Sequence, residues 1–175
     1  METESLRTND WLSSHSCTET MTADQAFLVY ADMVYRLAFS RTKNRYYAED
    51  VLQEVFMRYL RSKPSFESDD HRKAWFLRVT INCTKTYLTT AWFRHVVPLT
   101  DTLTTEAEPT GEVYDAVMRL PVKYRTVIHL FYYEDYTVEQ IAAVCKSKVS
   151  TVKSQLHRAR ALLREQLKGA DQDVF

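Results

Sequence analysis

Apolar residues recur at intervals of three and four along most of the chain, the spacing that lines one face of an α-helix. Order is expected from near Thr22, after a polar stretch that has no periodicity. The apolar face of the first predicted helix comprises Ala26, Val29, Tyr30, Met33, Val34, Leu37 and Ala38. The pattern therefore opens with an amphipathic helix.

Two more helices are predicted before the middle of the chain. The second has the most regular stripe, and Pro64 ends it because proline has no amide hydrogen to donate inside a helix. Its members are Ala48, Val51, Leu52, Val55, Phe56, Tyr59 and Leu60. A third helix is expected from about Asp70 to about Arg94, held by Trp75, Phe76, Val79 and Cys83. Of Trp75 and Phe76, at least one is expected in the core.

The periodicity stops between residues 96 and 111, where prolines, threonines and acidic residues predict a linker. A short helix over residues 112–120 comes next. Pro121 suits the first turn of the helix after it, which carries Val127, Ile128 and Phe131. The second half of the chain thus resumes the helical pattern.

Two closely spaced helices end the pattern. Thr137 and Gln140 fit a capping box, in which the side chain of each accepts from the backbone amide of the other. This short helix is expected to end near Cys145, and Ser150 to cap the last helix. The inner stripe of the last helix is Val152, Leu156, Ala159, Leu163 and Leu167. Two short-linked helices of this kind form a helix-turn-helix.

Composition agrees with an all-α fold of two small helical domains joined by a flexible acidic linker. Only two glycines and four prolines occur among 175 residues, too few for a protein rich in hairpins. The predicted organisation is an N-terminal extension over 1–21, domains over 22–95 and 112–168, the linker between them, and a tail over 169–175. No apolar run approaches the ~20 residues of a membrane span, and the N-terminus lacks an apolar signal region, so a cytoplasmic protein is expected.

Charge is distributed unevenly although the formal net charge is zero. Residues 96–118 hold five acidic residues and no Lys or Arg, whereas 146–168 hold seven basic residues against Glu165 alone. A basic stretch of this kind fits a polyanion, and a solvated helix face is the competing interpretation. Cys17, Cys83 and Cys145 are far apart and lack metal-ligand spacing, so they are interpreted as free thiols.

The helix-turn-helix pattern predicts DNA binding by the last helix, whose first turns would lie in the major groove. Its exposed face is expected to present Thr151, Lys153, Ser154, Gln155, His157, Arg158 and Arg160. Gln155 can bond adenine bidentately and Lys153 can reach guanine, while Arg158 and Arg160 can neutralise phosphates. A plain helical hairpin with solvated basic residues would show the same pattern.

Specific residues in both halves resemble one family, the extracytoplasmic-function (ECF) sigma factors of bacterial RNA polymerase. The second half resembles region 4, which binds the minus-thirty-five promoter element in that family. The matching residues are Leu120-Pro121, Tyr124-Arg125, Thr137 to Ala142, Thr151 to Ser154 and Leu156 to Arg160. Two positions depart from the family: Lys146 stands where glycine is common in the turn, and Gln155 replaces a frequent arginine.

The first half resembles region 2 of the same family. Residues 48–56 are similar to region 2.2, which implies that the polar face with Asp50, Gln53 and Glu54 binds the polymerase. Residues 73–82 are similar to region 2.3, which implies contacts with the minus-ten element. The residues expected to make them are Arg72, Lys73, Trp75, Arg78 and Asn82. A melted strand offers phosphates to basic groups and unstacked bases to aromatic ones.

The resemblance implies a transcription initiation factor that has no catalytic role, cofactor, metal site or small-molecule substrate. Its implied partners are core RNA polymerase, through the β′ clamp helices and the β subunit, and promoter DNA, with an anti-sigma factor as a further possibility. The main alternative is a stand-alone helix-turn-helix regulator. An enzyme is disfavoured because His, Cys and paired carboxylates do not gather at usable spacing.

Overall fold

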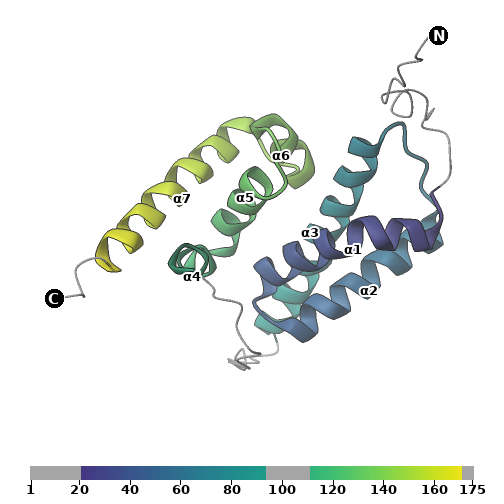
Figure 1. The fold of residues 1–175 in the computed structure, drawn as a ribbon, viewed down its shortest axis with the longest axis horizontal. Helices are drawn as coiled ribbons and strands as arrows, with labels where there is room; N and C mark the ends of the chain where they lie inside the picture. The colour runs from purple at the N-terminus through teal and green to yellow at the C-terminus, as the bar shows by residue number, and fades with distance from the viewer. Residues whose placement is uncertain (1–20, 94–110, 171–175) are drawn as a thin grey trace, which may run out of the picture.

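The structure, a computed structural model, describes residues 21–93 and 111–170, and these residues form seven α-helices without a strand. In chain order the helices are α1 (Ala23–Thr42), α2 (Arg45–Ser62), α3 (Asp69–Phe93), α4 (Glu112–Arg119), α5 (Val122–Tyr132), α6 (Val138–Cys145) and α7 (Val149–Ala170). They gather into two groups, α1–α3 and α4–α7 (Figure 1). The all-α prediction is confirmed, while most of the predicted linker lies outside the described residues.

The first domain is a bundle in which α1, α2 and α3 all pack against one another. Thr22 caps α1, and with Gln25 it makes a reciprocal capping box. The centre of the bundle is Phe76, which is fully buried and whose ring lies 4.7 Å from that of Tyr30 and 5.3 Å from that of Phe56. Burial of Phe76 confirms the expectation that at least one of Trp75 and Phe76 belongs to the core, whereas Trp75 is only half-buried.

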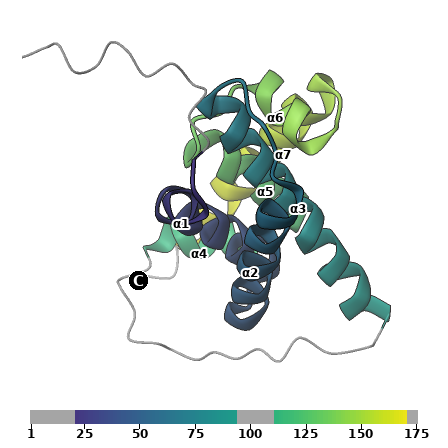
Figure 2. The same cartoon turned by 90° about the vertical axis from the view of Figure 1, so that its right-hand side faces the viewer.

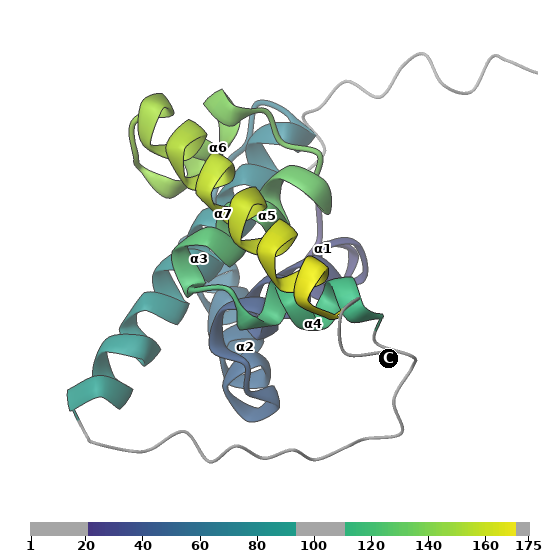
Figure 3. The same ribbon diagram turned by 90° about the vertical axis from the view of Figure 1, so that its left-hand side faces the viewer.

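The second domain packs α7 against α4, α5 and α6 (Figure 3). The predicted capping box of α6 is present: Thr137 accepts from the Gln140 amide, and Gln140 accepts from the Thr137 amide. Helix α7 already begins at Val149, so Ser150 lies in its first turn and the prediction that Ser150 caps it is wrong. Of the predicted inner stripe of α7, Val152, Leu156 and Ala159 are buried, and Leu163 and Leu167 are half-buried.

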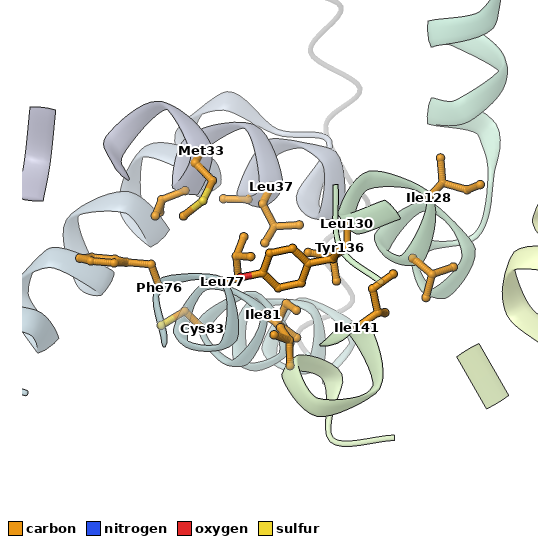
Figure 4. Packing of buried hydrophobic residues seen from close by; sticks show 14 of the residues in the cluster. Met33, Leu37, Phe76, Leu77, Ile81, Cys83, Ile128, Leu130, Tyr136 and Ile141 are labelled. Atoms are coloured by element: carbon orange, nitrogen blue, oxygen red, sulfur yellow. The ribbon is translucent and has the colours of Figure 1, made fainter. Parts of the chain in front are cut away.

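The two domains pack against each other. Helix α1 contacts α5, and α3 contacts α6. The ring of Tyr136, between α5 and α6, projects toward Leu77 of α3 and Leu37 of α1 (Figure 4). One continuous apolar core therefore runs through both domains.

Helix α3 packs against both domains, and this explains why the apolar periodicity failed to predict some of its buried residues. The predicted face of α3 turns toward α1 and α2, but Leu77 and Ile81 are also buried, at 0% and 2% exposure. These two face Tyr136 and Ile141 of the second domain (Figure 4). Conversely Leu60, predicted in the stripe of α2, is 48% exposed.

Two buried arginines join the domains through polar contacts. Arg125 of α5 donates to the backbone carbonyls of Ser40 and Arg41 in the last turn of α1, and to those of Met118 and Leu120 in its own domain. It thereby satisfies carbonyls that the end of a helix leaves without partners. Arg41 donates to the hydroxyls of Thr84 (2.6 Å) and Thr126. Burial lowers the pKa of each guanidinium to about 10.

The turn between α6 and α7 holds Lys146 in the left-handed region, with φ of 53°. Its amide hydrogen reaches the carbonyls of Ala142 and Ala143, which closes the end of α6. A side chain bearing a Cβ is disfavoured in this conformation, whereas glycine adopts it freely. Lys146 therefore ends α6 at a cost in backbone strain.

We expect Lys146→Gly to raise the free energy of unfolding by up to about 1 kcal/mol, measured by urea denaturation. Relief of left-handed strain, about 1–2 kcal/mol, outweighs the greater entropy that glycine gives the unfolded chain, about 0.4–1 kcal/mol. Lys153→Gly is the matched control, since Lys153 is an exposed lysine inside α7 without a positive φ. It should lose stability, and an equal loss in both variants would show that strain at Lys146 is negligible.

Candidate nucleic-acid interfaces

Helix α7 presents a polar face to solvent opposite its buried stripe. Of the seven residues predicted there, six are exposed and Gln155 is half-buried. The exposed ones are Thr151, Lys153, Ser154, His157, Arg158 and Arg160. The structure therefore brings all seven onto the accessible side of one helix, which contains no acidic residue before Glu165.

Helix α5 supplies two residues to this face that the sequence pattern did not single out as functional. Lys123 and Tyr124 border a hollow of about 340 Å³ together with Ser154, Gln155 and Arg158 of α7. A hydrogen bond from Arg158 lowers the pKa of the Tyr124 phenol. Tyr124 thus fixes the position of Arg158, and a signal for it existed in the Tyr124-Arg125 match to the family.

Arg160 is held in a similar way by aromatic residues at the end of α5. Its guanidinium donates to the Tyr132 hydroxyl at 3.0 Å and lies over the rings of Phe131 and Tyr132, at 5.2 and 5.7 Å. Stacked and hydrogen-bonded guanidinium groups lose less side-chain entropy when they bind an anion. Arg158 and Arg160 are therefore oriented in advance.

The basic residues predicted on α3 are close together but already have partners. Arg72 is buried, pairs with Asp69, and lies 5.5 Å from the Phe66 ring. Lys73 pairs with Glu134 at 3.0 Å, and Arg78 donates to the Ala143 carbonyl at 3.1 Å. Glu134 and Ala143 belong to the second domain, so Lys73 and Arg78 lie at the contact between domains.

The other two residues predicted on α3 differ in their surroundings. Trp75 belongs to an aromatic group with Tyr59 and Phe66, with ring centroids 5.9 and 6.0 Å away, and remains half-buried. Asn82 is exposed. A partly open indole beside basic residues has the composition that single-stranded nucleic acid requires.

A groove between α2 and α3 collects the three polar residues predicted on α2. Asp50, Gln53 and Glu54 line a volume of about 660 Å³, with Met57, Arg58, Cys83, Thr86 and Tyr87 completing it. Tyr87 donates to Asp50 at 3.3 Å, and Arg58 pairs with Glu54 at 2.7 Å. Burial, with the nearby Asp50 carboxylate, raises the pKa of the Tyr87 phenol. The groove therefore combines acidic acceptors with an apolar floor.

Other kinds of site find no support in the described parts of the chain. Within residues 21–93 and 111–170, no group of three or more His, Cys, Asp and Glu could hold a metal ion. No helix in the same ranges is long and apolar enough to cross a membrane. Cys83 and Cys145 are free thiols, and burial raises the pKa of both.

Comparison with known proteins matches the two domains separately. Residues 27–94 match the model of "Sigma-70 region 2", and residues 110–163 match that of "Sigma-70, region 4". The chain is 31% identical over 145 residues to RNA polymerase sigma factor SigV of Bacillus subtilis, spanning 78% of this chain and 86% of that protein. It is 32% identical over 147 residues to ECF RNA polymerase sigma factor SigL of Mycobacterium tuberculosis, spanning 77% and 82%.

The chain belongs to the ECF sigma factors. Accordingly, it is an RNA polymerase subunit that directs promoter recognition, as the resemblance in the sequence implied. Among solved structures, a sigma factor RpoE, crystallised with the anti-sigma factor NepR from Bartonella quintana, shares the fold. Its TM-score is 0.65 at 24% identity, and the match covers 83% of this sigma factor and 96% of that chain.

We expect Tyr124→Phe to weaken promoter binding by the reconstituted holoenzyme roughly two- to tenfold, because Arg158 loses the hydrogen bond that orients it, worth about 0.5–1.5 kcal/mol. The measurement is fluorescence anisotropy of labelled promoter fragments. Tyr133→Phe serves as the control, since Tyr133 is exposed and lies outside the hollow. Equal affinities in all three proteins would mean that Tyr124 does not position Arg158.

Proposed function

We propose that this sigma factor recognises promoters with two surfaces and holds the polymerase with a third. The exposed face of α7 reads the minus-thirty-five element. The first half of α3 binds the melted minus-ten strand through Arg72, Lys73, Trp75, Arg78 and Asn82. The groove of Asp50, Gln53 and Glu54 receives the β′ clamp helices. The observation that carries the proposal is the accessible polar face of α7 with its two oriented arginines.

Position along α7 supports a division between base reading and phosphate binding. Lys153, Ser154 and Gln155 lie in the first two turns, which a helix entering the major groove presents to base edges. Arg158 and Arg160 lie further along, where the DNA backbone approaches the helix. Arg158 borders the same hollow as Lys123, a further basic residue, whereas Arg160 is held at the other end of α5 by Phe131 and Tyr132.

We expect Gln155→Ala to change the preferred minus-thirty-five bases, at a loss of about 1–3 kcal/mol for a good bidentate contact. Arg158→Ala or Arg160→Ala should weaken all sequences alike and reduce the slope of log affinity against log salt by about 0.9 each. Promoter libraries transcribed by reconstituted holoenzyme measure both effects. If Arg158→Ala changed the preferred minus-thirty-five bases and Gln155→Ala left them unchanged, the roles assigned to these two residues would be wrong.

The groove between α2 and α3 has the properties of a polymerase contact. Asp50 and Glu54 are acceptors at its edge, and Met57, at 42% exposure, offers an apolar contact beside them. Interfaces of this type combine an apolar centre with a charged rim. The present partners of the carboxylates, Tyr87 and Arg58, hold them in place for an incoming basic partner.

We expect Asp50→Ala combined with Glu54→Ala to weaken association with core polymerase roughly tenfold or more, at unchanged helicity and melting temperature. Surface plasmon resonance with immobilised core polymerase provides the measurement. Asp24→Ala combined with Asp32→Ala is the matched control, because it also removes two carboxylates from the first domain but outside the groove. Wild-type affinity in the groove variant would contradict this role.

The remaining inferences follow from family membership. We infer that the protein acts in the cytoplasm, without catalytic chemistry of its own, and that an anti-sigma factor is among its partners. The alternative of a stand-alone regulator is disfavoured by the groove on α2, which a protein that binds DNA unaided does not need. Copurification with core polymerase separates the two functions.

A further inference from the structure

Two of the three basic residues proposed to bind the minus-ten strand, Lys73 and Arg78, face oxygen acceptors of the second domain. The Lys73 ammonium lies 3.0 Å from a carboxylate oxygen of Glu134 and donates to the Glu134 carbonyl at 3.1 Å. Arg78 donates to the Ala143 carbonyl at 3.1 Å. Anionic and carbonyl oxygens offer a basic side chain the same kind of contact as phosphate oxygens do.

Glu134 is buried in this contact, with 9% of its surface exposed. A buried carboxylate is costly unless it is paired and hydrogen-bonded. Burial alone would raise the pKa of Glu134, but the His129 ring, 3.5 Å away, and the Lys73 ammonium hold it below its usual value. Since His129 belongs to the same domain, Lys73 is the partner that only the packed arrangement supplies.

An apolar anchor lies directly beside this ion pair. Tyr136 projects from the second domain toward Leu37 and Leu77 of the first (Figure 4). The Lys73 ammonium lies 5.3 Å from the centre of its ring, and burial raises the pKa of the phenol to about 12. The segment between α5 and α6, residues 133–137, thus combines a charged and an apolar contact with α3.

We propose that residues 133–137, with the Ala143 carbonyl, act as an intramolecular ligand that covers the minus-ten surface of α3 in the free sigma factor. Glu134 takes the place of a phosphate on Lys73, and Tyr136 fixes the segment in the first domain. Helix α7 lies on the side of the second domain away from α1 and α2 (Figures 1 and 2), and six of its seven predicted DNA-binding residues are exposed. The inference rests on the proposed role of α3.

The distance between the two promoter elements requires the two domains to separate. Elements centred 10 and 35 base pairs upstream lie on the order of 80 Å apart along straight DNA, at about 3.4 Å per base pair. A compact body of about 130 residues has a radius of gyration of only ~14 Å. The packed arrangement therefore cannot place α3 and α7 on both elements at once, and the domains must separate on the promoter.

The test compares the wild-type full chain with Glu134→Gln, which keeps the shape of the side chain but removes its charge. Glu139→Gln is the matched control, an exposed glutamate on α6 without a contact to α3. Small-angle X-ray scattering reports the separation of the domains. Anisotropy of a fluorescein-labelled single-stranded 12-mer of mixed sequence reports access to α3. Circular dichroism verifies folding.

We expect Glu134→Gln to expand the radius of gyration by roughly a third and to tighten binding of the 12-mer about tenfold. The control should match the wild type in both measurements. If Glu134→Gln does not fold, Tyr136→Ser takes its place, because it removes the apolar anchor instead of the charge. An expanded wild type, or a folded variant as compact as the wild type, overturns the inference.

The two measurements also separate this inference from the proposed function. A variant that expands without gaining affinity for the 12-mer would show that the segment does not cover a DNA-binding surface, and the inference would be wrong. Association with core polymerase and promoter selectivity are measured independently. If the wild type neither bound core polymerase nor selected promoters, the proposed function would be refuted. The scattering comparison would still decide whether the two domains pack together in the free protein.

Discussion

Burial of two neighbouring faces of α3, one in each domain contact, is the constraint on which the rest of this sigma factor depends. One side supplies Phe76 to the aromatic centre of the first domain, and the other supplies Leu77 and Ile81 to the contact with the second. A helix that is buried on more than one face has little exposed surface left for charged residues. Here Lys73 and Arg78 lie along its flanks, so each must find an acceptor wherever the second domain covers it.

The contact between the domains contains two buried arginines, and their hydrogen bonds show how the buried charge is accommodated. None of the ion pairs within the described ranges involves Arg41 or Arg125, and hydroxyls and carbonyls alone satisfy their guanidinium groups. Neutral acceptors compensate the loss of hydration only in part. The contact therefore gains specificity from many directed hydrogen bonds, but less stability than an apolar contact of equal area would give.

Local signals in the sequence were sufficient to predict the helices and the exposed face of α7. The capping box at Thr137 and the inner stripe of α7 could be predicted because both depend on residues a few positions apart. The contacts of Lys73 with Glu134 and of Arg41 with Thr126 could not, because they join residues 61 and 85 positions apart. Periodicity identifies a buried face only when that face has one neighbour. It therefore missed Leu77 and Ile81, which pack against a second neighbour.

The closed packing joins two bodies that both carry an excess of basic residues, over 21–93 and over 111–168. Repulsion between like charges on the two bodies is screened as ionic strength rises, and at 0.15 M the screening length is only about 8 Å. Added salt therefore favours the closed form at the same time as it weakens phosphate contacts. A salt titration of DNA binding by the free chain then overstates the number of phosphates contacted, since part of its slope comes from the closing of the two domains.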